Sequence, residues 1–203
     1  MSAPQVLIVF TSRGGTTESM ALAIAEGARE AGADVVLRRA REVVDRETMA
    51  HAPGWIEAAD RMNALYDAPS PDDVAAADAV VIGSPTRFGM VSSEIKAFLD
   101  SLGGIWFQGK TYGKVGAAFT STSTPHGGNE NTLTGLFPVM AHLGWVIVPN
   151  GYGDPAVFGS GSPYGPTTVS GQNSTPPTEG DLTVARLQGR RVAQVAAALK
   201  NAG

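Results

Sequence analysis

Residues 11–18 (TSRGGTTE) combine hydroxyl side chains with two adjacent glycines, directly after an apolar run at 6–10. A helical pattern follows at 20–31, so this stretch is predicted to join a strand to the start of a helix. The first N–H groups of a helix lack partners within it, and the helix dipole adds positive potential there. We therefore expect the loop to bind a phosphate. The alternative is an ordinary helix cap by Thr16 or Thr17.

Two further loops carry small polar residues, 83–89 (GSPTRFG) and 121–128 (STSTPHGG). Each follows a predicted strand, and open α/β sheets bind ligands outside the carboxyl ends of their strands. We expect both loops to meet 11–18 at one edge of the sheet. Together they suit a ligand with one phosphate and a planar polar ring.

Residues 104–111 (GIWFQGKT) match the phosphate-binding pattern G-x-x-x-x-G-K-T letter for letter. A working loop of that kind follows a strand and begins a helix. Here a helix is predicted before the match, up to Leu102, and a strand after it, from 114. We therefore expect a rigid turn that carries Trp106 and Phe107, and no nucleotide triphosphatase site at Lys110.

Strand-like and helix-like segments alternate along the chain, which predicts an α/β fold with a doubly wound, five-stranded parallel sheet and helices on both faces. The predicted strands are 5–10, 33–38, 78–83, 114–120 and 145–148. The predicted helices are 17–31, 95–102, 129–142 and 179–200.

Two segments interrupt this alternation, at about 43–72 and 149–178, and we interpret them as insertions in one domain spanning 1–203. Both hold apolar side chains beyond the needs of a minimal core, which favours an interface between subunits. Lids folded over their own domain are the alternative. The apolar residues in question are Trp55, Met62, Leu65, Tyr66, Phe158, Tyr164 and Val169.

Composition excludes several classes of function. The formal net charge of the 203 residues is −4, which does not favour binding to nucleic acid or to an anionic membrane surface. Without cysteine there is no disulfide, thiolate metal site or cysteine nucleophile. No export signal or long apolar run is visible, so we expect a cytoplasmic protein without a membrane span.

Six pieces of the chain resemble the WrbA-type NAD(P)H:quinone oxidoreductases, which are FMN enzymes of the flavodoxin superfamily. They span nearly the whole chain, and the P-T-R-F-G and P-Y-G-x-T-T pieces are distinctive. The pieces are 12–17, 85–89, 103–106, 121–128, 141–144 and 163–168.

The resemblance implies a flavodoxin-like fold and a set of cofactor-binding residues. The residues implied to bind the FMN phosphate are Ser12, Arg13, Gly14, Gly15, Thr16 and Thr17. Those implied to bind the flavin ring are Pro85, Thr86, Arg87, Phe88 and Gly89. Those implied to bind the ribityl chain and the ring are Ser121, Thr122, Ser123, Thr124, His126 and Gly127. His142 is a further ring contact, and Trp106 is the aromatic wall for the substrate.

The chain departs from the family in two places. Gly14 stands where familiar members have a tyrosine that contacts the nicotinamide nucleotide, with Arg13 beside it. Pro125 and His126 make the 121–128 loop one residue longer than in some members.

The resemblance implies an enzyme that uses FMN to pass two electrons from NADH or NADPH to a quinone, without a metal, in a homotetramer. The flavin carries the chemistry, so no protein residue is expected to act as a catalytic group. A flavodoxin-like electron carrier, or an FMN-dependent partner-binding protein, is the alternative. The modest net charge disfavours a carrier, which usually docks through a strongly charged face. An azoreductase or nitroreductase would differ only in its electron acceptor.

Overall fold

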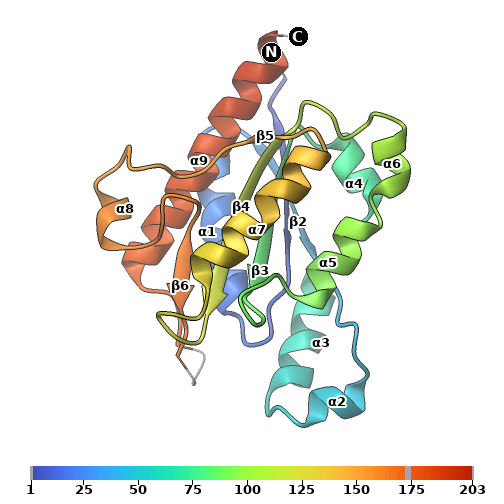
Figure 1. Ribbon diagram of the computed structural model, residues 1–203, viewed down its shortest axis with the longest axis vertical. Coiled ribbons are helices and arrows are strands. Elements are labelled where there is room, and N and C mark those ends of the chain that lie inside the picture. The colour runs from blue at the N-terminus through green and yellow to red at the C-terminus, as the bar shows by residue number, and fades with distance from the viewer. Residues whose placement is uncertain (1, 172–174, 203) are drawn as a thin grey trace.

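The computed structural model describes residues 2–171 and 175–202 and contains a sheet whose ladders are all parallel (Figure 1). The strand order is β2-β1-β3-β4-β5, with β6 also paired to β4, which confirms the doubly wound arrangement. The strands are β1 (Gln5–Phe10), β2 (Asp34–Arg39), β3 (Ala79–Pro85), β4 (Val115–Thr122), β5 (Val146–Ile147) and β6 (Thr167–Val169).

Helices cover both faces of the sheet, as predicted (Figure 1). Buried side chains of α1 and α9 pack on one face, and those of α4, α5, α6 and α7 pack on the other. The helices are α1 (Thr16–Glu30), α2 (Arg46–Ala50), α3 (Trp55–Leu65), α4 (Pro71–Ala76), α5 (Ser93–Asp100), α6 (Gly103–Phe107), α7 (Asn129–His142), α8 (Ala156–Gly159) and α9 (Glu179–Ala202).

Strand β1 shows why its apolar run is continuous. Val6, Ile8 and Phe10 belong to the core on the α1 and α9 face. Leu7 and Val9 belong to the core on the opposite face. Successive side chains of a strand point to opposite faces, so a strand covered on both faces needs apolar residues at every position.

The insertion at 43–72 folds mainly into α2 and α3, which project beyond the carboxyl ends of the strands (Figure 1). Trp55 packs with Met49 in a small core of its own, and Met62 joins the core under α1. The expectation that Trp55 and Met62 add exposed apolar surface is therefore wrong. Leu65 is exposed.

The insertion at 149–178 contributes α8 and one strand that the sequence did not predict, β6; its residues 172–174 lie outside the described part. Strand β5 pairs only with Val115 and Gly116, at the start of β4. Strand β6 pairs with the end of β4, Thr120 to Thr122. The short β5 leaves this part of the β4 edge open, and the insertion fills it. A three-residue strand is too short to show a period-2 pattern in the sequence.

None of the helices within the described ranges is long and apolar enough to cross a membrane.

Candidate functional site

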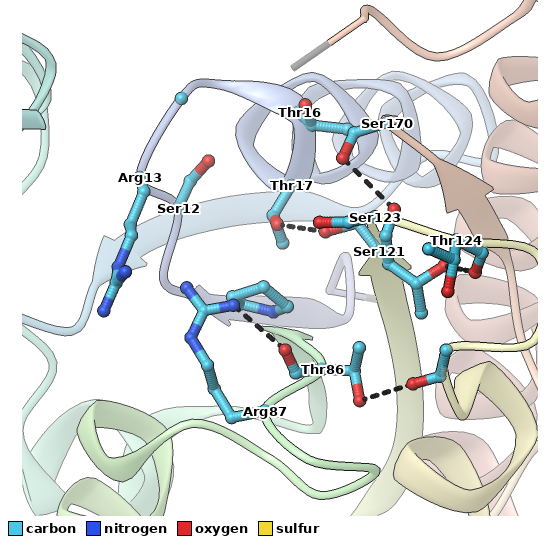
Figure 2. A pocket seen from close by; sticks show the side chains of 14 residues that line it. Ser12, Arg13, Thr16, Thr17, Thr86, Arg87, Ser121, Ser123, Thr124 and Ser170 are labelled. Carbon is cyan, nitrogen blue, oxygen red and sulfur yellow. Dashed lines mark hydrogen bonds between the residues drawn. The ribbon is translucent and has the colours of Figure 1, made fainter. Parts of the chain in front are cut away.

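A cavity of about 380 Å³ opens at the carboxyl ends of β1, β3 and β4 (Figure 2). All three loops that the sequence singled out line it, so the predicted convergence is confirmed. The lining residues are Ser12, Arg13, Gly14, Thr16, Thr17, Pro85, Thr86, Arg87, Ser121, Thr122, Ser123, Thr124, Gly127 and Ser170.

Helix α1 begins at this cavity without a side-chain cap. Its N-cap residue is Gly15, in the left-handed region with φ 96°, and no side-chain cap accepts a hydrogen bond from the first N–H groups of the helix. The alternative of a cap by Thr16 or Thr17 is therefore wrong. Ser12 Oγ instead accepts a hydrogen bond from the Gly15 N–H at 3.0 Å, and Thr17 Oγ1 lies 2.9 Å from Ser121 Oγ. The N–H groups of the first turn of α1 stay available to an anion.

A carboxylate in the first turn of α1 is neutralised by the 43–72 insertion. Glu18 is buried, and it pairs with Arg61 and accepts a hydrogen bond from the Tyr66 hydroxyl at 3.0 Å. Burial, and next the bond to Glu18, raise the pKa of Tyr66 to about 12. Since Arg61 offsets the charge of Glu18, the end of the helix keeps its positive potential.

A buried arginine supports the phosphate-loop candidate from behind. Arg39, at the end of β2, is fully buried, and its Nη2 donates to the carbonyl oxygen of Ser12 at 3.2 Å. The same guanidinium pairs with Glu42 and donates to Asn63. Burial alone would raise the pKa of Glu42, but hydrogen bonds, chiefly from Arg39, lower it. Arg39 thus links the loop to α3, through its bonds to Ser12 and Asn63.

The segment after β3 forms a tight turn at the rim. The Arg87 N–H donates to the Met90 carbonyl at 2.7 Å, with Phe88 (φ 51°) and Gly89 (φ 77°) between them in left-handed conformations. Phe88 is the one non-glycine residue with positive φ in the described chain, and its ring is fully exposed. Such a conformation costs free energy in a bulky residue and often marks a functional site.

The remaining predicted residues divide into two groups. Gly15, Phe88, Gly89 and His126 do not line the cavity; Gly15, Phe88 and His126 each lie next in sequence to a residue that does, and Gly89 lies two residues from Arg87. Trp106 and His142 lie elsewhere: Trp106 Nε1 donates to the His142 carbonyl oxygen at 3.0 Å, at the C-terminal end of α7. Helix α7 begins beside the rim, because an added Cβ on Gly128 would lie 2.9 Å from Gly89 Cα. Fourteen residues of helix then separate His142 from the cavity by about 20 Å.

Sequence reasoning missed one lining residue, Ser170. It follows β6 directly, and its N–H donates to the Thr122 carbonyl oxygen at 2.8 Å. The P-Y-G-x-T-T piece just before it was noted in the sequence, but the unforeseen pairing of β6 with β4 is what brings Ser170 to the cavity.

The G-x-x-x-x-G-K-T match at 104–111 follows a helix and precedes a strand, as predicted, which is the reverse of the order in a phosphate-binding loop of that kind. It lies between α5 and β4, and its helical part is the five-residue α6. None of its residues lines the cavity. Among residues 2–171 and 175–202, there is also no cluster of three or more His, Asp or Glu side chains that could hold a metal ion.

Comparisons with known proteins agree with this geometry. Residues 4–154 match the family model for NADPH-dependent FMN reductases. An NAD(P)H dehydrogenase (quinone) of Caulobacter vibrioides is 44% identical over 200 residues, covering 95% of this chain and 96% of the relative. One of the same name from Rhizobium rhizogenes is 40% identical over 203 residues, covering 96% and 98%.

Solved structures show the same architecture. A flavodoxin, WrbA-like protein from Agrobacterium tumefaciens superposes with a TM-score of 0.68 at 28% identity, covering 97% of this chain and 99% of that one. An archaeal flavodoxin, at 19% identity, shares the fold with a TM-score of 0.62, over 95% and 99% of the two chains. The flavodoxin-like fold is thereby confirmed, and the chain belongs to the NADPH-dependent FMN reductase family.

Proposed function

We propose that this protein is an FMN-dependent NAD(P)H dehydrogenase that reduces quinones to hydroquinones. One nicotinamide nucleotide and one proton are consumed for each quinone, which takes up two electrons and two protons. Relatives at 40–44% identity, matched over nearly their whole length, carry the name NAD(P)H dehydrogenase (quinone). We also propose that 1–203 forms one FMN-binding domain and that the protein is cytoplasmic.

The observation that carries the proposal is the uncapped N-terminus of α1 at a hydroxyl-lined cavity. Its unpaired N–H groups and neutral hydroxyls suit a single phosphate ester. The chain has no G-x-G-x-x-G after β1 for a pyrophosphate, which favours FMN over FAD. In this proposal Ser12 and residues 14–17 hold the phosphate, Pro85, Thr86, Phe88 and Gly89 the ring, and 121–127 with Ser170 the ribityl chain.

Bound flavin supplies the redox chemistry, taking a hydride from the nicotinamide nucleotide and giving two electrons to the quinone. The protein's part is to position both ligands and to stabilise developing charge. The N–H groups of Thr86 and Arg87 already donate to the carbonyl oxygens of Ser121 and Met90, so they are not free to bind the ring. Within the described residues, the N–H groups of Phe88 and Gly89 have no acceptor. We assign the stabilising role to these two.

A flavin spectrum tests this proposal. The purified protein should show the absorption of oxidised flavin, lose it when NADH or NADPH is added without oxygen, and recover it on addition of benzoquinone. Flavin released by heat should run as FMN on chromatography. A protein that binds FMN but is not reduced by either nucleotide would be a carrier, and FAD in place of FMN would contradict the assignment of the phosphate site.

We further propose that the active form is a homotetramer whose sites are completed across subunits. The resemblance places Trp106 and His142 at the cofactor, yet in one chain they lie at the far end of α7 from the cavity. A second copy can bring them there. Trp106, Phe107 and Tyr112 also expose large aromatic surfaces, and Phe107 is 87% exposed. Patches of this kind usually mark an interface, and the number four comes from the resemblance.

Light scattering with and without FMN tests the assembly. We expect a tetramer whose FMN affinity falls on dilution, because a ligand that binds the assembled form stabilises it. Phe107→Glu should dissociate the tetramer and weaken FMN binding. Leu22→Glu, on an exposed apolar residue of α1 outside both insertions, is the matched control. A fully active, flavin-loaded monomer at micromolar concentration would contradict shared sites.

A further inference from the structure

Two arginines line the same side of the cavity, opposite the 121–124 loop (Figure 2). Arg13 follows β1 and Arg87 follows β3. Among residues 2–171 and 175–202, no carboxylate lies within ion-pair distance of either guanidinium. The cavity therefore presents two positive charges that the protein itself does not neutralise.

Arg13 is held in place by the 43–72 insertion. Its guanidinium carbon lies 3.7 Å from the centre of the Trp55 ring, a cation–π contact. Trp55 is itself buried and donates from Nε1 to Glu42 at 3.3 Å. Figure 2 shows the Arg13 side chain directed away from the hydroxyls of Ser12 and Thr17. Arg13 is thus positioned for a ligand other than the phosphate at the start of α1.

Arg87 faces the same region from the other loop. Its Nη1 donates to the Thr86 carbonyl oxygen at 2.9 Å, which fixes the guanidinium over the cavity. Burial, and next the charge of Arg13, lower the pKa of Arg87, while Glu94 acts in the opposite direction. The two positive charges repel each other. An anion bound between the two guanidinium groups would therefore be stabilised by both charges and would relieve their repulsion.

The charge of the pair selects among the phosphates of the electron donor. Both NADH and NADPH contain a pyrophosphate, in which each phosphorus carries one negative charge. The 2′-phosphate of NADPH is a monoester that carries nearly two charges at pH 7. The planar guanidinium group of arginine binds such a phosphate through two parallel, charge-assisted hydrogen bonds. We propose that Arg13 and Arg87 bind the 2′-phosphate and that the protein prefers NADPH to NADH. This inference rests on the proposed function.

Calorimetry on the FMN-loaded protein tests the proposal without turnover. The probes are 2′,5′-ADP, which carries the 2′-phosphate, and ADP-ribose, which carries a pyrophosphate esterified at both ends, as in NADH, and no 2′-phosphate. Arg13→Gln should weaken the binding of 2′,5′-ADP by about tenfold or more, and that of ADP-ribose much less. Arg46→Gln removes one positive charge from the insertion that holds Arg13, where Arg46 pairs with Asp60 at the surface, and should change neither.

Steady-state kinetics should agree with the binding data. Arg13→Gln should raise the KM for NADPH by a similar factor and leave kcat and the KM for NADH nearly unchanged. Trp55→Leu should give a smaller change in the same direction, because it removes the ring that holds Arg13. Arg13→Lys keeps the positive charge but loses the paired donors of the guanidinium group. Its KM for NADPH should lie between those of Arg13→Gln and the unmodified protein.

Three results would overturn the inference. Weaker FMN binding by Arg13→Gln, measured by flavin fluorescence, would assign Arg13 to the cofactor phosphate. A loss for ADP-ribose as large as that for 2′,5′-ADP, or larger, would show that the pair does not select the 2′-phosphate. If Arg13→Gln weakened the binding of neither probe, Arg13 would not belong to a binding site for the nucleotide phosphates. In each case the unmodified protein still binds FMN and reduces quinones, whereas failure of the proposed function would appear as no flavin reduction by either nucleotide.

Discussion

The guanidinium of Arg39 donates a hydrogen bond to the main-chain carbonyl of Ser12 across 3.2 Å, although 27 residues separate them in sequence. Arg39 is fully buried and paired with Glu42, so Arg39→Met leaves a carboxylate buried without its partner. We expect a loss of about 3–5 kcal/mol in the free energy of unfolding. FMN affinity should fall as well, because the loop loses its support.

The double variant Arg39→Met with Glu42→Leu provides the control for this prediction. Removing both charges avoids the unpaired carboxylate, so its loss of stability should be clearly smaller than the sum of the two single losses. Urea unfolding of the four proteins measures the difference. Additive losses would contradict a coupled ion pair.

Replacing Thr16 and Thr17 together by alanine tests the hydroxyls at the start of α1. If they bond to the charged phosphate, FMN binding should weaken by about 1–3 kcal/mol, measured by flavin fluorescence. Thr134→Ala is the matched control, because the Thr134 hydroxyl bonds within α7 to the Glu130 carbonyl at 2.8 Å. Unchanged FMN affinity in the double variant would place the phosphate elsewhere.

Lys110→Ala should leave FMN affinity and quinone turnover largely unchanged, because Lys110 lies in a turn away from the cavity. The purified protein should also show no ATP hydrolysis above background. An ATPase activity that disappears in this variant would restore the nucleotide triphosphatase interpretation of residues 104–111.

Helices α1 and α9 meet at two glycines that tolerate no side chain. A Cβ added to Gly189 would lie 1.9 Å from the Ile24 carbonyl oxygen, and one added to Gly27 would lie 2.0 Å from that of Arg186. Gly189→Ala forces the helices apart, and we expect a loss of about 1–3 kcal/mol or more. Gly103→Ala is the control, since its added Cβ meets nothing within 4 Å. Thermal unfolding of both variants measures the contrast.

Tyr66 should make stability fall at alkaline pH. Its pKa is about 12 in the folded protein, against about 10 in an unfolded chain. The folded state therefore holds this proton more tightly, and the contribution present below about pH 10 is lost as the pH rises toward 12. Tyr66→Phe removes the titration but keeps an edge-on contact with Phe10. Its stability, from urea midpoints between about pH 9 and 12, should decline less steeply.

Much of the site could be predicted because its residues stand next to clear elements. The loops at 11–17 and 121–127 follow apolar strands, and that position alone implies their convergence. Ser170 was not predicted, because β6 has only three residues and because the pairing of β6 with β4 depends on β5 being short. The support from Arg39, and the contact of Arg13 with Trp55, also depend on how α3 docks. No local pattern encodes such docking, because tertiary packing determines it.

Strand β6 also has a consequence for the order in which the protein matures during synthesis. The cavity wall begins at Ser12 and is completed only by Ser170, near the end of the 203 residues. Ser170 is synthesised 158 residues after Ser12, so the pocket is complete only after β6 has paired with β4. Cofactor capture is then a late step that follows assembly of the sheet and does not guide it. In the proposed function the apoprotein reaches most of its fold without FMN, and bound FMN then contacts residues that lie 158 positions apart in the sequence.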